Sequence, residues 1–170
     1  MSGTHFVQRL AAVLLLSGLA SVVSADAYED GLSAVNTGNF PAAFSAFKTA
    51  AALGSAEAQF NLGGMYANGQ GVSPDYVQAL GWFKKAAGQG FALAQYNLGL
   101  MYAAGRGTAQ DDVQAVSWYR KAADQGLPDA QSNLGLMYAS GRGVSQDAEQ
   151  AVSWWRKAAG QGYAAAQTNL

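Results

Sequence analysis

A fifteen-residue block returns at a fixed interval along this chain and constrains its fold more than any other feature. It reads AQFNLGGMYANGQGV from Ala58, AQYNLGLMYAAGRGT from Ala94 and AQSNLGLMYASGRGV from Ala130, and it begins again as AQTNL at Ala166. The interval is 36 residues each time. Self-similarity at such a period is typical of a solenoid, in which each unit buries its apolar face against its neighbours. The sequence therefore predicts stacked repeats rather than one closed core.

Each unit contains signals for two helices. The first is predicted from about Ala56 to Ala67, with Ser55 as N-cap, and a later copy has Pro128 at the first helical position. The second begins after an acid that has a glutamine three residues later, a variant of the capping box. This D-x-x-Q pattern occurs at Asp75, Asp111 and Asp147. Glycines such as Gly88 and Gly90 are expected to end the second helix.

The residues that face the core follow from the helical step of 100° per residue. On the second helix Ala79, Phe83 and Ala86 point together. On the first helix Ala58, Leu62, Gly63 and Tyr66 share one face. Small residues opposite large ones favour closely packed antiparallel helices.

The units have the form A-x-A-Q-x-N-L-G-x-M-Y-x-x-G-x-G-V-x-x-D-x-x-Q-A-x-x-W-x-x-K-A-A-x-Q-G, and in this they resemble Sel1-like repeats, relatives of tetratricopeptide repeats. The resemblance implies an all-α fold, an α/α superhelical solenoid of helix-turn-helix repeats that acts as an adaptor for protein complexes. It also implies an exported bacterial protein. A cysteine-rich subgroup is linked to β-lactam binding, but this chain has no cysteine.

We divide the chain by this pattern into six segments. They are a signal peptide (1–25), a degenerate N-terminal capping repeat (26–54), three Sel1-like repeats (55–90, 91–126 and 127–162) and the start of a further repeat (163–170). The first segment has a basic start, the apolar run LAAVLLLSGLA and small residues around Ala25, which are typical of a cleaved secretory signal. We therefore expect a periplasmic or secreted protein with no integral membrane span after cleavage. The uncovered edge at residues 163–170 predicts self-association.

Composition excludes several kinds of site. The formal net charge is −1, so no global positive field favours nucleic acid. The single histidine, His5, lies in the predicted signal, and without cysteine no histidine or thiolate metal site can form in the remainder. Ser45 and Lys48 spell the S-x-x-K motif of serine β-lactamases, but Ser45 occupies the same repeat position as Ser117 and Ser153, so we interpret it as ordinary helix sequence. No cofactor and no catalytic residue are predicted.

The outer face of the first helix is the predicted partner-binding surface. Its apolar and small residues lie opposite the core stripe and are Phe60, Gly64, Tyr96, Leu100 and Leu136. Such a face suits a groove that receives a peptide or helix, and equally suits contact with the neighbouring repeat.

A ladder of asparagines runs beside the core stripe, at Asn61, Asn97, Asn133 and Asn169. A carboxamide offers both donors and an acceptor, so these side chains suit the grip of a peptide backbone or terminal carboxylate. The alternative is a hydrogen bond between repeats that satisfies a loop carbonyl.

Basic residues follow aromatic ones on the second helix of each repeat, in the pairs Lys84-Lys85, Arg120-Lys121 and Arg156-Lys157. This ridge either binds anionic groups or solvates the outside of the helix. Arg106 and Arg142 in the glycine loops offer the same alternatives. From the sequence we expect a non-enzymatic scaffold that binds a protein or peptide through the concave face of the first helices. The alternatives are an envelope enzyme or ligand-binding protein acting on cell-wall or β-lactam material, and an envelope module that uses the basic ridge.

Overall fold

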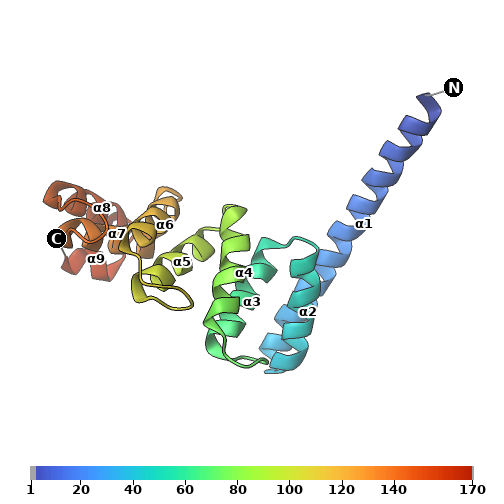
Figure 1. Cartoon of the computed structure of the whole chain (residues 1–170), viewed down its shortest axis with the longest axis horizontal. Coiled ribbons are helices and arrows are strands. Elements are labelled where there is room, and N and C mark those ends of the chain that lie inside the picture. Colours follow the sequence, from blue (N-terminus) through green and yellow to red (C-terminus); the bar gives the residue numbers. More distant parts are fainter. Residues whose placement is uncertain (1–2, 170) are drawn as a thin grey trace. The chain divides into compact units, whose positions relative to one another are not determined.

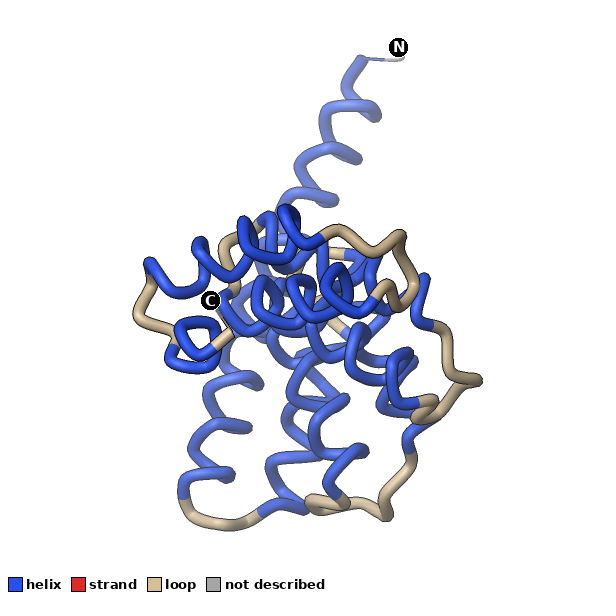
Figure 2. Tube along the Cα trace, turned by 90° about the vertical axis from the view of Figure 1, so that its left-hand side faces the viewer, coloured by secondary structure: helices blue, strands red, loops and turns tan. Residues whose placement is uncertain are grey.

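The computed structural model describes the backbone of residues 3–169 and the side chains of residues 19–169. Within these residues every regular element is an α-helix, and short loops join the helices (Figure 2). In chain order they are α1 (Gly3–Asn36), α2 (Phe40–Ala52), α3 (Ala56–Asn68), α4 (Tyr76–Gly88), α5 (Ala92–Ala104), α6 (Asp112–Asp124), α7 (Pro128–Ser140), α8 (Ala148–Gly160) and α9 (Ala164–Thr168), labelled in Figure 1. The predicted all-α class is confirmed.

The chain divides into two compact units, Met1–Pro74 and Asp75–Leu170. In the first unit α2 packs against both α1 and α3. In the second unit each helix from α4 to α9 packs against the next one along the chain. We call α1, α3, α5, α7 and α9 the A helices, and α2, α4, α6 and α8 the B helices. Each repeat consists of one A helix followed by one B helix.

The predicted helix starts are confirmed. The Ser55 hydroxyl accepts a hydrogen bond from the Ala58 N–H at 3.1 Å, and α7 begins at Pro128. The Asp75 carboxylate accepts from the N–H groups of Val77 and Gln78, at 2.9 and 3.0 Å. Asp111 and Asp147 cap α6 and α8 in the same way. Each cap satisfies an N–H that the helix itself leaves without a partner.

The B helices end in a glycine turn. After α4, the Gly90 N–H donates to the Ala87 carbonyl at 3.0 Å, and the Phe91 N–H donates to the Ala86 carbonyl at 3.2 Å. Gly90 has φ of +89°, which glycine adopts without a steric penalty. This pair of bonds is a Schellman motif, and it turns the chain into the next A helix.

In three repeats a glycine of the A helix lies directly against an aromatic ring of the B helix that follows it. A Cβ added at Gly99 would overlap the Tyr119 ring, and one added at Gly135 would overlap the Trp155 indole. A Cβ added at Gly31 would likewise overlap the Phe47 ring. The missing side chain lets the two helices approach closely, so the predicted packing of small residues against large ones is confirmed.

The glycine loops pack against the preceding repeat. Gly107 has φ of +70°, and a Cβ there would overlap the Tyr76 carbonyl group at the start of α4. Gly143 has φ of +66° and lies in the same way against the Asp112 carbonyl group at the start of α6. The second glycine of each loop is therefore required both by its φ and by this close approach.

Helix α1 runs without a break through the residues around Ala25 where cleavage is predicted. Beyond that point its Tyr28 ring packs against Phe47 of α2, with 5.7 Å between the ring centroids. Before it, the Ser24 hydroxyl donates to the Ala50 carbonyl at 3.4 Å. Among the helices that the structure describes, none combines the length and the apolar character needed to cross a membrane. The signal peptide and the self-association of residues 163–170 stay predictions.

Gly99→Ala should destabilise the protein by about 1–3 kcal/mol, because the added methyl group must displace the Tyr119 ring from a filled core. Urea denaturation followed by circular dichroism measures the free energy of unfolding. The matched control is Gly81→Ala in α4, where an added Cβ meets nothing within 4 Å. There alanine should be neutral or stabilise by up to about 1 kcal/mol, because it favours the helix over the unfolded chain. Equal effects at both positions would contradict the packing described.

Candidate binding surface on the A helices

The outer face of α5 carries a stripe of four residues. Leu93, Tyr96, Asn97 and Leu100 are spaced by three, four and seven residues, which places them on one side of the helix. The two leucines are 42% and 38% exposed, while Tyr96 and Asn97 are half-buried. The Asn97 amide donates to the Leu93 carbonyl within the same helix at 2.8 Å. Leu100 therefore lies on an outward face, as predicted, while the Tyr96 ring packs against Tyr119 at the edge of that face. Leu93 extends the face by one turn.

Helix α7 presents an equivalent face made of Asp129, Asn133 and Leu136. These residues also follow the spacing of four and seven residues, and Leu136 is 46% exposed. The Asp129 carboxylate accepts a hydrogen bond from the Tyr163 hydroxyl at 2.9 Å. Tyr163 directly precedes α9, so this bond joins the face of α7 to the start of the next A helix.

Asn133 connects α7 to two tyrosines of the preceding repeat. Its side chain lies close to the hydroxyl groups of Tyr96 of α5 and Tyr119 of α6, whose ring centroids lie 5.9 Å apart. Burial raises the pKa of Tyr119 to about 12, and the neighbouring Tyr96 adds to that shift. Burial also raises the pKa of Tyr96, with a further contribution from the Asp129 charge. Both hydroxyls therefore keep their protons at neutral pH.

In the first unit, the predicted residues Phe60, Asn61 and Gly64 lie half-buried on α3. The Asn61 amide donates to the Tyr28 hydroxyl of α1 at 3.5 Å. An added Cβ at Gly64 would meet nothing within 4 Å, so this position is open like its equivalents Leu100 and Leu136.

The asparagine ladder is not uniform. Asn61 donates to a tyrosine hydroxyl of the preceding A helix and Asn133 lies close to one, whereas Asn97 donates to a carbonyl of its own helix. The tyrosines concerned, Tyr28 and Tyr96, share a repeat position at which the intervening copy has Phe60, a side chain without a hydroxyl. Asn61 therefore forms a bond between repeats, but with a hydroxyl group rather than with the loop carbonyl that we predicted as the alternative. Asn169 is half-buried directly after α9.

A network of glutamines joins the repeats, and we did not predict it from the sequence. Gln59, Gln95 and Gln131 of the A helices are at most 6% exposed. Their amides donate to carbonyls at the end of the preceding B helix, Ala51, Ala87 and Ala123, at 3.2–3.3 Å. Gln125 then donates to the Gln95 side chain at 2.8 Å, and Gln161 donates to that of Gln131 at 2.9 Å. The recurring A-Q and Q-G dipeptides carry this signal in the sequence.

The basic ridge on the B helices lies over aromatic rings. The Nζ atoms of Lys85, Lys121 and Lys157 lie 3.8–4.0 Å from the ring centroids of Trp82, Trp118 and Trp154, one turn earlier on the same helix. Arg120 also donates to the Tyr138 hydroxyl of the next A helix. Cation–π contacts of this kind hold the charged groups on the outer side of the B helices.

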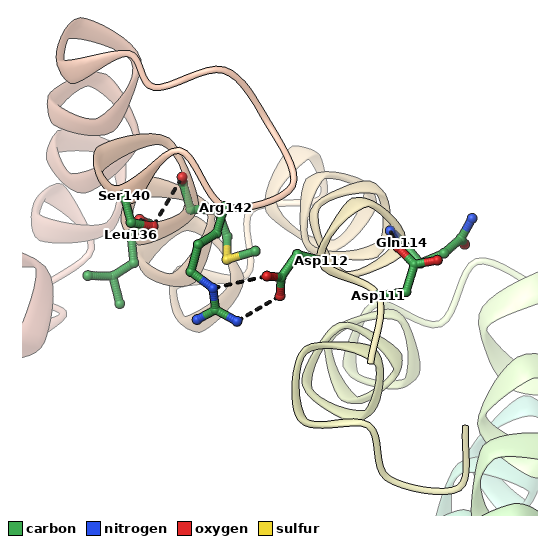
Figure 3. A network of polar contacts seen from close by, with 7 residues as sticks. Asp111, Asp112, Gln114, Leu136, Ser140 and Arg142 are labelled. Carbon is green, nitrogen blue, oxygen red and sulfur yellow. Dashed lines mark hydrogen bonds and ion pairs between the residues drawn. The ribbon is translucent and has the colours of Figure 1, made fainter. Parts of the chain in front are cut away.

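Arg142 in the loop after α7 forms a bidentate ion pair with Asp112 at the start of α6 (Figure 3). Its Nη2 and Nε atoms lie 2.7 and 3.1 Å from the two carboxylate oxygens. The hydrogen bond from Arg142 lowers the pKa of Asp112. Arg106 lies over the Tyr76 ring, at the equivalent position one repeat earlier, 5.6 Å from its centroid. Arg142 therefore has an anionic partner within the chain, which disfavours the alternative that it binds an external anion.

Ser45, which we interpreted from the sequence as an ordinary helix residue, lies within α2. Ser45 is exposed on α2, and its backbone carbonyl accepts from the Thr49 hydroxyl at 3.3 Å. Across the described side chains, no group of histidine, cysteine, aspartate and glutamate residues could hold a metal ion.

Removal of the buried Gln131 side chain tests the glutamine network. Gln131→Ala leaves the Ala123 carbonyl and the Gln161 amide without this partner, so we expect a loss of about 1–3 kcal/mol in the free energy of unfolding. Gln167 occupies the same repeat position but is exposed, so Gln167→Ala should change stability by less than about 0.5 kcal/mol. Chemical denaturation measures both variants. If they behave alike, the network does not stabilise the stack.

The raised pKa of Tyr119 predicts a loss of stability at high pH. The unfolded chain releases this proton near the ordinary value of 10.0, while the folded protein holds it until about 12, so the folded state loses its advantage as pH rises between these values. Urea denaturation across this range should show a smaller loss for Tyr119→Phe than for the unchanged protein. Identical pH profiles would contradict the assignment.

Comparison with known proteins identifies three repeats. A family model described as Sel1 repeat matches residues 56–91, 92–127 and 128–163. Comparison with curated protein sequences gives no match.

Three solved structures are similar to this chain. The c5321 protective antigen present in uropathogenic Escherichia coli strains, which displays an SLR fold, is 48% identical with a TM-score of 0.72 over 73% of this chain and 27% of the antigen. A Sel1 repeat protein from Oxalobacter formigenes is 36% identical with a TM-score of 0.78, over 82% of this chain and 57% of that protein. The Helicobacter pylori cysteine-rich protein B is 32% identical with a TM-score of 0.50, over 52% of this chain and 66% of that protein. This chain thus spans about a quarter and somewhat over half of the lengths of the first two.

Proposed function

Because this chain belongs to the Sel1 repeat family, we propose that it is a non-enzymatic scaffold that binds another protein or peptide through its A helices. Proteins built from such repeats generally mediate protein–protein interactions. In the second unit the proposed binding surface is the set Leu93, Tyr96, Leu100, Asp129, Asn133 and Leu136, which we call the A-helix surface. In the first unit Phe60, Asn61 and Gly64 form the corresponding face of α3, and Asn97 completes the stripe on α5.

The observation that supports this proposal is the exposure of leucine on the A helices. Leu93, Leu100 and Leu136 are 38–46% exposed, whereas Leu98 and Leu134 of the same helices are fully buried. Exposed aliphatic residues beside half-buried tyrosines are typical of a surface that receives an extended peptide or a helix. The tyrosine and asparagine groups beside them supply hydrogen bonds that fix the orientation of a partner.

The proposal includes export. The basic start, the apolar run from Leu10 to Ala20 and the small residues around Ala25 support a cleaved signal and a periplasmic or secreted location. Cleavage after Ala25 would leave the contact between Tyr28 and Phe47, so α1 keeps an aromatic anchor on α2. Mass spectrometry of the protein recovered from the producing cell tests this point. A mature chain that begins near Asp26 or Tyr28 is expected, and an intact Met1 would refute it.

Leu100→Ala combined with Leu136→Ala should weaken binding to the natural partner by about tenfold or more, because the partner loses its apolar contact with both leucine side chains. The partner is first recovered by crosslinking and affinity capture, then purified, and its dissociation constant is measured by calorimetry. The matched control is Val77→Ala combined with Val113→Ala, at exposed aliphatic positions of the B helices. This control should keep full affinity and the fold of the unchanged protein. The reverse pattern would move the binding surface to the B helices and refute the proposal.

A further inference from the structure

Basic and acidic residues are segregated between the two kinds of helix. After residue 18, every lysine and arginine lies on a B helix or in a glycine loop, at Lys48, Lys84, Lys85, Arg106, Arg120, Lys121, Arg142, Arg156 and Lys157. From α3 onward the A helices carry only two charged residues, Glu57 of α3 and Asp129 of α7, and both are acidic. A partner of α3, α5 and α7 therefore meets negative charge and no positive charge on these helices.

The two acidic residues differ in their surroundings. Glu57 accepts a hydrogen bond from the Ser55 hydroxyl at 3.1 Å, beside the N-cap of α3. Asp129 lies among tyrosines: the Tyr163 hydroxyl donates to it at 2.9 Å, and its charge is close enough to Tyr96 to raise the pKa of that phenol. The side chains of residues 19–169 include no lysine or arginine that forms an ion pair with Asp129.

The Asp129 carboxylate has bonding capacity left over. Two oxygens offer about four acceptor sites, of which the Tyr163 hydroxyl occupies one. Tyrosine rings attract cations through their faces, so the two tyrosines and the carboxylate favour the same sign of charge. Leu136 follows Asp129 by seven residues on the same face, which places an exposed aliphatic contact two turns away.

We propose that Asp129, with Tyr96 and Tyr163, binds a lysine or arginine side chain of the partner, while the aliphatic neighbours of that residue contact Leu100 and Leu136. This inference rests on the proposed function, and it names the chemistry of the segment that the A-helix surface recognises: a basic residue within an apolar stretch of polypeptide. A phosphate-bearing partner carries the same negative charge as Asp129 and would be repelled by it. A single carboxylate with tyrosine neighbours is too poor in oxygen ligands for a calcium site.

Two synthetic peptide libraries test the proposal on the full chain. Both consist of fluorescein-labelled, end-blocked nonapeptides with leucine at two flanking positions; one has lysine at the centre and the other has glutamate. Fluorescence anisotropy measures their dissociation constants. The lysine library should bind at least about tenfold more tightly, and sodium chloride at about 0.5 M should reduce the difference, because salt screens an exposed ion pair.

Asp129→Asn should remove the preference for lysine, since asparagine keeps an acceptor for the Tyr163 hydroxyl but loses the charge. The matched control is Asp124→Asn on α6, an exposed acidic residue of a B helix, which should retain the preference. Thermal unfolding of each variant verifies that the repeats remain folded. A lysine preference that survives Asp129→Asn overturns the inference.

The remaining outcomes separate this inference from the proposed function. If both libraries bind equally and Leu100→Ala with Leu136→Ala abolishes that binding, the A-helix surface binds peptides but the cationic preference is wrong. If neither library binds while the natural protein partner is still captured through the leucines, the inference is likewise overturned and the proposed function stands. If lysine peptides bind independently of the leucines, the proposed contact of their aliphatic neighbours is wrong.

Discussion

The close contact between a glycine of α1, α5 or α7 and an aromatic ring of the B helix that follows it is the constraint on which the rest of the structure depends. Because Gly99 and Gly135 have no side chain, Tyr119 and Trp155 can occupy the space between the paired helices. The ring of Tyr119 is thereby buried, with its hydroxyl beside Asn133 of the next repeat. Because Gly99 faces the B helix, the next residue, Leu100, lies on the outer side of the A helix.

Polar groups between the repeats form hydrogen bonds and ion pairs with other residues of the chain. The glutamine network joins the ends of α2, α4 and α6 to the A helix that follows each of them, and Arg142 is paired with Asp112. Lys85, Lys121 and Lys157 of the B helices lie over tryptophans of the same helix. What remains open on α5 and α7 is a small set of leucines and, among tyrosines, the Asp129 carboxylate. A protein or peptide partner would bind these groups without disrupting the contacts that hold the stack together.

The helical architecture could be predicted from the sequence because its signals repeat in phase. The capping residues Asp111 and Asp147, the start of α7 at Pro128 and the glycine–aromatic packing all follow from local rules that need no knowledge of the neighbours. The outward position of Leu100 and Leu136 followed from helical periodicity in the same way.

Contacts across repeats could not be predicted so well. The hydrogen bond of Gln131 depends on where the preceding helix ends, and the surroundings of Asn133 depend on a hydroxyl 37 residues away at Tyr96. Leu93 was missed because the two neighbouring copies have an acid at its repeat position, Glu57 and Asp129, so the pattern concealed an exposed aliphatic residue.

Site-specific photocrosslinking tests the central claim most directly. A photoreactive phenylalanine analogue is placed singly at Leu100 and Leu136 on the A helices, and at Val77 and Val113 on the B helices, in the cell that produces the protein. Our account predicts that the same partner is crosslinked from both A-helix positions and from neither B-helix position. Crosslinks to that partner from the B helices alone would contradict it.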